Sequence, residues 1–327
     1  MQKVLVTGAS GFVGGHVVGA LLSRGIAVRC LVRDKRRLEF IAPMAPELAL
    51  GDVTLPETLP GSLEGVDAVV HCAGLTRAAS LQAFRDVNED GCRNLLAAVR
   101  NSGRGIVKVV HVSSLAAIGP AVDGIPVTEE SAPHPVSDYG ISKLAGHRLA
   151  ESFMGELPVS IVIPPVVYGP RDADLLVYFK LSARGIMPLL GSGPRSLSLI
   201  YVKDLAEAIA ATLVSDESAG KSYLVEDGCV QTWASLADAI DGEMGANAAR
   251  IRVPAAVARL AGVTGDFVSS ISGKTAVLNS QKVKEFLQNA WTCSSRRIRA
   301  DLGFHPRYSL EQGIKETLAW YRKEKWL

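Results

Sequence analysis

The fold is decided by the stretch Val4-Leu5-Val6-Thr7-Gly8-Ala9-Ser10-Gly11-Phe12-Val13-Gly14. Its first four residues are apolar or β-branched and predict a strand, and residues 12–23 predict a helix. The glycines between them allow a tight turn and a close approach of backbone to an anion, toward which the helix N-terminus points. We therefore predict that this turn binds the pyrophosphate of a dinucleotide, with Gly8, Ser10, Gly11, Phe12, Val13 and Gly14 as the binding residues.

The sequence after this turn strengthens the prediction. The glycine spacing, three residues apart, differs from the commoner G-x-G-x-x-G pattern and would be weak evidence alone. However, Gly25 is placed to end the helix, and residues 26–32 form a second apolar run that predicts a strand. Together these segments have the length of a βαβ unit, the context in which such a turn binds nucleotides.

Strand and helix patterns alternate through the first half of the chain. Apolar runs predict strands at residues 4–7, 27–32, 48–50, 68–71, 106–112 and 159–163. Helical periodicity covers 81–101 and 139–155. We predict an α/β fold with a Rossmann-type, doubly wound parallel sheet in residues 1–170. Beyond Pro170 the alternation decays, although helices are predicted near 202–214 and 310–323, so residues 171–327 are expected to form mainly a smaller, mixed substrate-binding lobe that returns some segments to the sheet.

Composition excludes several classes of protein. The 327 residues are 48% hydrophobic and 21% charged, which suits a large buried core. A net charge of +2 without a long basic block gives no case for nucleic-acid binding. Five dispersed cysteines without a C-x-x-C pair predict free thiols and no metal site. The longest apolar segment, 253–263, is shorter than the roughly 20 residues of a membrane span. We expect a cytoplasmic protein.

Two polar motifs suggest the chemistry. Tyr139 and Lys143 are four residues apart and share one face of the predicted helix, where a nearby ammonium would lower the pKa of the phenol and make it a usable acid or base. Ser113 and Ser114 follow the strand 106–112, and ligands of open parallel sheets lie beyond the carboxyl ends of strands. A serine hydroxyl there can hydrogen-bond the oxygen whose proton Tyr139 transfers.

In this order, the glycine turn, the serine pair and the Tyr-x-x-x-Lys motif resemble the extended short-chain dehydrogenase/reductase superfamily, of the NAD-dependent epimerase/dehydratase type. The resemblance covers almost the whole chain. It implies that Ser114, Tyr139 and Lys143 carry catalysis and that Lys143 also holds the nicotinamide ribose. It also includes the segments Gly51-Asp52-Val53-Thr54, His71-Cys72-Ala73-Gly74 and Pro164-Pro165-Val166, which imply cofactor contacts by Asp52, Val53, Cys72, Ala73, Gly74, Pro165 and Val166.

Departures from the family pattern reduce the number of reactions expected of this chain. Leu115 and Ala116 stand where sugar-nucleotide 4,6-dehydratases have an Asp-Glu pair, so dehydration by that mechanism is not expected. Leu197 stands where an arginine often holds the diphosphate of a sugar nucleotide, and Arg195 is two residues away from that position. Because a diphosphate requires a paired charge, these changes favour a less charged substrate.

The end of the second strand bears on the choice of cofactor. An acidic residue there usually binds the ribose 2′-hydroxyl of NAD, whereas an arginine accommodates the 2′-phosphate of NADP. Arg33 falls at the selecting position, with Lys35 and Arg36 behind it, as in dihydroflavonol-reductase-like members. We predict NADP, with NAD as the alternative, since a shift of one residue would transfer the role to Asp34.

We thus predict an enzyme that transfers hydride between NADP or NAD and a ketone or secondary alcohol, as in reductase and 3β-hydroxysteroid-dehydrogenase-like relatives. A sugar-nucleotide epimerase with tightly bound NAD is the alternative, and a non-catalytic nucleotide-binding protein a third. The partner is a small molecule. The resemblance also implies a homodimer through helices 88–101 and 138–155.

Three other features have expected structural roles. His71 and His111 are expected to be buried packing residues, since they lie in or at the end of apolar strands. His147 follows Tyr139 by eight residues and can share its helix face, although a catalytic role is not favoured. The apolar segment 254–263 is expected to cover the substrate cleft.

Overall fold

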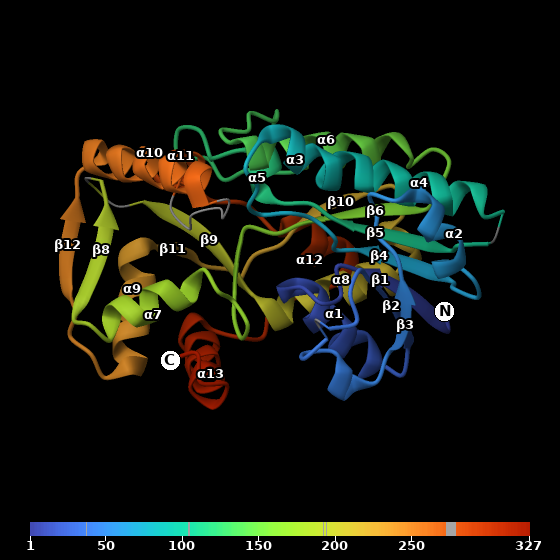
Figure 1. The fold of residues 1–327 in the computed structure, drawn as a ribbon, viewed down its shortest axis with the longest axis horizontal. Coiled ribbons are helices and arrows are strands. Elements are labelled where there is room, and N and C mark those ends of the chain that lie inside the picture. Colours follow the sequence, from blue (N-terminus) through green and yellow to red (C-terminus); the bar gives the residue numbers. More distant parts are fainter. Residues whose placement is uncertain (37, 104, 192, 194, 273–278) are drawn as a thin grey trace.

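The computed structural model describes residues 1–36, 38–103, 105–191, 193, 195–272 and 279–327. A parallel seven-stranded sheet dominates it, with the strand order β10-β6-β5-β4-β1-β2-β3 (Figure 1). The strands are β1 (Lys3–Thr7), β2 (Ala27–Val32), β3 (Glu47–Leu50), β4 (Ala68–His71), β5 (Lys108–Val112), β6 (Val159–Ile163) and β10 (Ser222–Leu224). The order reverses at β1, and the predicted α/β Rossmann-type fold is confirmed.

Helices cover both faces of this sheet (Figure 1). One layer contains α1 (Phe12–Leu22), α8 (Val202–Val214) and α12 (Arg296–Leu302). The opposite layer contains α2 (Leu59–Ser62), α3 (Leu81–Arg85), α4 (Gly91–Asn101), α5 (Leu115–Ile118) and α6 (Asp138–Ser152). Alternate residues of every strand except the edge strand β3 enter two separate cores, as Val4 and Leu5 of β1 do. Both faces are therefore buried, which explains why the strands are almost continuously apolar.

The second lobe is smaller and mixed. Its strands are β7 (Val166–Tyr168), β8 (Ile186–Leu190), β9 (Ser196–Tyr201), β11 (Val230–Thr232), β12 (Ala249–Val253) and β13 (Ala290–Trp291). Its helices are α7 (Leu175–Ser182), α9 (Trp233–Met244), α10 (Ala255–Ser272), α11 (Ser280–Phe286) and α13 (Leu310–Lys323). A third apolar core joins α7, α9, α13 and β9. Because β10, α8 and α12 pack on the main sheet, the chain beyond residue 170 contributes to both lobes.

The helix predicted over residues 81–101 is present as one continuous helical run, with a π-helical turn inside it. This turn, Asp86–Asp90, separates α3 from α4 and points Asn88 inward. The Asn88 amide donates to the carbonyl oxygen of Leu75 and to Ser142 Oγ, and its oxygen accepts from the Leu75 N–H. These hydrogen bonds join the π-helical turn to α6 and to the segment after β4. They stabilise the π-helical hydrogen-bond register, which the apolar periodicity of the sequence does not predict.

Two element ends also differ from the prediction. The strand expected from residue 106 begins at Lys108, and the helix expected to reach residue 155 ends at Ser152. The start of α6 is set by Ser137, whose side chain accepts the Gly140 N–H as an N-cap. This cap fixes the helical register that carries Tyr139 and Lys143.

Candidate active site

A cavity of about 770 Å³ lies where the carboxyl ends of the main-sheet strands meet the second lobe. Segments that follow β1, β2, β4, β5 and β6 contribute to its wall, as expected of an open parallel sheet. The wall contains all the residues predicted for catalysis and cofactor binding, namely Ser114, Tyr139, Lys143, Gly8, Ser10, Gly11, Phe12, Val13, Gly14, Arg33, Asp52, Val53, Cys72, Ala73, Gly74, Pro165 and Val166. The structure brings these residues together, and their individual roles remain predictions.

The glycine turn has the geometry of a phosphate cradle. Gly8 has a φ of +68°, and a Cβ on it would lie 2.7 Å from the backbone nitrogen of Ala73. A Cβ on Gly11 would meet only the Gly8 carbonyl oxygen, at 3.0 Å, and would otherwise enter open space. Gly11 caps α1 without a side-chain hydrogen bond. The first N–H groups of α1 thus face the cavity, and these residues fit a dinucleotide diphosphate.

Replacing Gly14 by alanine is expected to distort this turn, because the added Cβ would lie 2.2 Å from the Gly8 carbonyl oxygen. We expect a loss of about 1–3 kcal/mol in the free energy of unfolding, typical of an overpacked site, and weaker binding of NADPH. Urea denaturation and calorimetric titration with NADPH measure the two effects. Gly61→Ala is the matched control, since a Cβ on Gly61 meets nothing within 4 Å; equal effects of both changes would contradict the turn's role.

Arg171 lies beside the glycine turn and was missed by the sequence analysis. Its guanidinium donates to the carbonyl oxygens of Ser10 and Gly11, and it stacks 3.8 Å over the ring of Phe40. Burial lowers the Arg171 pKa to about 10, so the side chain stays cationic at neutral pH. Its Nε is buried without a hydrogen-bond partner among the described residues. A cation at this place suits a diphosphate, and the only sequence signal was its position after the Tyr168-Gly169-Pro170 segment.

The predicted catalytic side chains come from two adjacent elements. Ser114 follows β5 and caps α5, where its hydroxyl accepts the Ala116 N–H at 3.2 Å. Tyr139 lies in the first turn of α6, where the hydroxyl of Ser114 is near enough to lower its pKa. Lys143 lies one turn further along, and its ammonium donates to the Val112 carbonyl oxygen at 2.8 Å. The Ser114 hydroxyl, the Tyr139 phenol and the Lys143 ammonium group thus all belong to residues that line the cavity.

Burial controls the protonation of this group. It raises the pKa of Tyr139 above its usual value, against the opposing effect of the Ser114 hydrogen bond. It lowers the pKa of Lys143 to about 8, because the ammonium is desolvated near the thiols of Cys72 and Cys92. The charges that act on Tyr139 are those of Lys282 and Glu285. The expectation that Lys143 lowers the pKa of Tyr139 is therefore not met in this structure. Desolvation of the phenol raises this pKa and outweighs the effects that lower it.

The histidines near the cavity are structural in this arrangement. His71 and His111 are buried, and burial lowers the pKa of both, so the rings are neutral at physiological pH. His71 bonds to Thr7 Oγ1 at 2.7 Å. His147 does not itself line the cavity; its Nδ1 lies 3.0 Å from Ser113 Oγ and its Nε2 lies 3.3 Å from a carboxylate oxygen of Glu151. The expectation of packing roles for His71 and His111 agrees with this burial.

The second lobe supplies residues that the sequence analysis did not find. Lys282 and Glu285 lie on α11, line the cavity and form an ion pair at 3.0 Å. Glu285 also accepts from Ser137 Oγ at 2.6 Å, which ties α11 to the cap of α6. No local pattern in the sequence indicates these residues, because the contact joins positions 148 residues apart. They place a cation and an anion opposite Tyr139.

The prediction that residues 254–263 cover the substrate cleft is wrong. These residues belong mostly to α10, and none of them lines the cavity. Instead, α10 packs on α11 and leaves large apolar side chains exposed, among them Val257, Leu260, Val263, Phe267 and Val268. The cleft is covered by α11 because Glu285 and Gln281 bond to the start of α6. Helical amphipathicity alone cannot tell which of two neighbouring helices faces a cavity.

The fold and this cavity define a dinucleotide-binding α/β enzyme with a serine, a tyrosine and a lysine at one site. A family model for the NAD-dependent epimerase/dehydratase family matches residues 4–225. The chain belongs to this family, within the extended short-chain dehydrogenase/reductase superfamily, and is an NAD(P)-dependent enzyme.

Two curated relatives and one solved structure illustrate the range of the family. A ceramide reductase of Caulobacter vibrioides is 33% identical over 329 residues, covering 99% of this chain and 96% of its own length. The N-acetyl-alpha-D-glucosaminyl-diphospho-ditrans,octacis-undecaprenol 4-epimerase of Escherichia coli O157:H7 is 27% identical, covering 97% and 94%. A dTDP-glucose 4,6-dehydratase of Bacillus anthracis, solved with NAD, superposes with a TM-score of 0.80 at 21% identity, covering 100% and 98%, which shows the shared fold.

Within the described part of the chain, the helices are too short or too polar to cross a membrane.

Proposed function

We propose that the protein reduces a ketone to a secondary alcohol, with NADPH as the hydride donor and Ser114, Tyr139 and Lys143 as the catalytic residues. The observation that carries the proposal is that Ser114, Tyr139 and Lys143 line one cavity, where burial raises the pKa of the tyrosine above its usual value. The name of the Caulobacter relative, a reductase, supports this direction of the reaction.

The residues have distinct tasks in this proposal. Ser114 donates a hydrogen bond to the substrate carbonyl oxygen and orients it. Tyr139 transfers its phenolic proton to that oxygen as the alcohol forms. Lys143 binds the nicotinamide ribose, and the glycine turn with Arg171 binds the diphosphate. The bound nicotinamide supplies the hydride. Since burial raises the pKa of Tyr139, the phenol retains its proton at neutral pH, which suits an acid in the reductive direction.

The wall of the cavity does not favour a sugar nucleotide or dehydration. Leu115 and Ala116 line it at the positions where dehydratases have acidic residues. Leu197 is buried in the second lobe, and Arg195 is folded against Gly191 rather than along the cavity. A diphosphate on the substrate would therefore lack the arginine that family members often provide.

Arg33 supports NADP as the cofactor. Arg33 lines the cavity, 67% exposed, with its guanidinium 3.8 Å from the Asp52 carboxylate. Asp34, the competing candidate, accepts from the Arg36 backbone N–H and forms an ion pair with the Arg36 guanidinium at 2.8 Å. Because its carboxylate is already paired with Arg36, Asp34 is a poor ligand for a ribose hydroxyl. Arg33, by contrast, can reach a 2′-phosphate.

Arg33→Gln is expected to weaken NADPH binding by about 10–100-fold and to leave NADH binding nearly unchanged, because one charge-assisted hydrogen bond contributes about 1.5–3 kcal/mol. Isothermal titration calorimetry with both nucleotides measures this without turnover. Arg24→Gln is a matched control, since Arg24 pairs with Glu207 outside the cavity. If the wild type binds NADH more tightly and Arg33→Gln changes neither affinity, Asp34 holds the ribose instead.

Identifying the nucleotide released on denaturation of the purified protein tests the proposed reaction against epimerisation. An epimerase keeps its NAD bound while it oxidises and re-reduces one substrate, whereas a reductase exchanges its cofactor in each turnover. An empty site stabilised selectively by NADPH, with NADPH consumed in the presence of ketones, is the expected result. Stoichiometric bound NAD would favour the epimerase suggested by the Escherichia coli relative. Binding without turnover on broad substrate panels would indicate a non-catalytic protein.

We also propose a homodimer in which α4 and α6 pair with the same helices of a second subunit. These helices lie side by side on one outer face of the main sheet (Figure 1). Sedimentation equilibrium measures the mass of the assembly.

A further inference from the structure

We propose that the cavity binds an amphiphilic ketone, with a polar group near Tyr139 and a hydrocarbon chain along an aromatic arm formed by the second lobe. The arm is the part of the cavity wall made by Leu175, Tyr178, Leu199, Trp233, Leu236 and Phe286. This inference rests on the proposed function, because it names the class of substrate that the same site takes.

The arm is a continuous aromatic surface. Tyr178 of α7 stacks on Trp233 of α9, with ring centroids 5.8 Å apart and an interplanar angle of 17°. Phe286 of α11 meets the same indole edge to face at 5.3 Å. Leu236, behind them, belongs to the apolar core of the lobe. Rings held against one another in this way present apolar area at little cost in side-chain entropy, which suits a flexible alkyl or prenyl chain.

One end of the arm lies on α11, the helix that also carries Lys282 and Glu285. Phe286 adjoins Glu285, which together with Lys282 acts electrostatically on Tyr139. From Phe286 the row of aromatic rings continues through Trp233 to Tyr178. A hydrocarbon chain attached near the reacting carbonyl can therefore lie along these rings. A polar group beside the carbonyl would lie against the Lys282 and Glu285 pair. The cavity is therefore polar at the reacting end and apolar at the far end.

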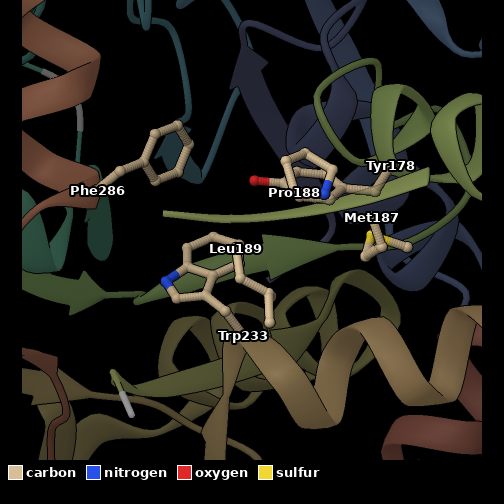
Figure 2. Close-up of a pocket in the computed structure, with 6 residues that line it drawn as sticks. All are labelled: Tyr178, Met187, Pro188, Leu189, Trp233 and Phe286. Atoms are coloured by element: carbon tan, nitrogen blue, oxygen red, sulfur yellow. The ribbon is translucent and has the colours of Figure 1, made fainter. Parts of the chain in front are cut away.

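The far end of the arm is narrow. A crevice of about 10 Å³ continues past Tyr178, Trp233 and Phe286 to Met187, Pro188 and Leu189 of β8. Figure 2 shows these six side chains converging from α7, β8, α9 and α11. Such a space accepts about one water-sized sphere. We thus expect binding affinity to stop rising with the length of the hydrocarbon chain once that chain fills the arm.

The test is the affinity of the cofactor-loaded protein for a homologous series of 2-alkanones from butanone to tetradecanone, followed by tryptophan fluorescence. Each methylene that enters the arm is expected to tighten binding by about fourfold until a plateau is reached, since burying one CH₂ contributes about 0.8 kcal/mol. Turnover with NADPH is measured separately on the same series.

Phe286→Glu places a carboxylate in the arm. It is expected to weaken binding of 2-dodecanone by at least about tenfold more than binding of 2-butanone, because the long chain loses its contact with the whole apolar arm and the short one loses little. Phe267→Glu is the matched control; Phe267 lies on the neighbouring α10, is 66% exposed and does not line the cavity. Tyr178→Gln, on the opposite wall, is the second variant, and circular dichroism checks the fold of all three.

The outcomes separate this inference from the proposed function. Affinity that rises with chain length without turnover supports the arm and counts against the proposed reaction. Turnover with an affinity that does not depend on chain length overturns the arm and leaves the reaction intact. Equal losses in Phe286→Glu and Phe267→Glu, or equal losses for short and long ketones, also overturn it.

Discussion

Tyr139→Phe is expected to lower the rate of ketone reduction by about 10²–10⁴-fold and to leave NADPH affinity within about threefold of the wild type. The change removes only the phenolic hydroxyl, which is the proton donor of the proposed reaction and the group whose pKa Ser114 lowers. The ring keeps its contact with Phe84, at a centroid distance of 5.9 Å, so the fold is not expected to change. Stopped-flow measurement of NADPH oxidation, with titration calorimetry for the cofactor, checks both expectations.

The pH dependence gives this prediction a second readout. Because burial raises the pKa of Tyr139 above its ordinary value, the phenol stays protonated through neutral and mildly alkaline pH. The wild-type rate of reduction is therefore expected to show no loss from this group up to about pH 9, whereas alcohol oxidation, which needs the phenolate, rises with pH across the same interval. The rise in oxidation should be absent in Tyr139→Phe. A variant with near-wild-type turnover would exclude Tyr139 as the proton donor.

Lys143→Met is expected to lower turnover by about 10²-fold or more and, at the same time, to stabilise the free protein at pH 7. The ammonium is buried near Cys72 and Cys92 and bonds to the Val112 carbonyl oxygen. Its charge is costly there, which is why its pKa falls to about 8. Removing the charge should raise the free energy of unfolding by about 1–3 kcal/mol, in proportion to the desolvation that is relieved.

The sign of the pH effect follows from that pKa. Lys143 has a lower pKa in the folded than in the unfolded state, so between about pH 8 and 10.5 the unfolded chain binds more protons at this position. Wild-type stability is thus expected to gain from this group as pH rises through that window. The advantage of Lys143→Met should be full below pH 8 and shrink above it. Urea denaturation at pH 7 and pH 9.5 measures the difference; an advantage that grows with pH would contradict the assigned burial cost.

The main sheet and the glycine turn could be predicted because their signals are local. An apolar run that ends in Gly8 and leads into a helix needs only neighbouring residues to define a βαβ unit, and the same holds for the strand that leads to Ser114. Tyr139 and Lys143 share a face because they are four residues apart on one helix. The strands from β1 to β6 accordingly lie within two residues of their predicted bounds.

The errors arise where one segment is set by another. Asn88 lies in a π-helical turn inside the predicted helix and bonds to Leu75 and Ser142, and the apolar period of residues 81–101 does not indicate those partners. Nothing local in the apolar segment 254–263 or in α11 indicates which of them faces the cavity, and the contacts of α11 with α6 decide between them. Backbone register and helix placement are decided by such contacts rather than by propensity.

The sequence by itself determined the fold class, the nucleotide-binding turn and the candidate catalytic serine, tyrosine and lysine, because each depends on spacing within one strand, turn or helix. Only the tertiary structure placed Arg171 beside that turn, set Lys282 and Glu285 opposite Tyr139 and assembled the aromatic arm from α7, α9 and α11. It also buries Tyr139, which raises the pKa of the phenol. These features depend on desolvation and on contacts between residues more than 50 positions apart, and such quantities exist only once the chain has folded.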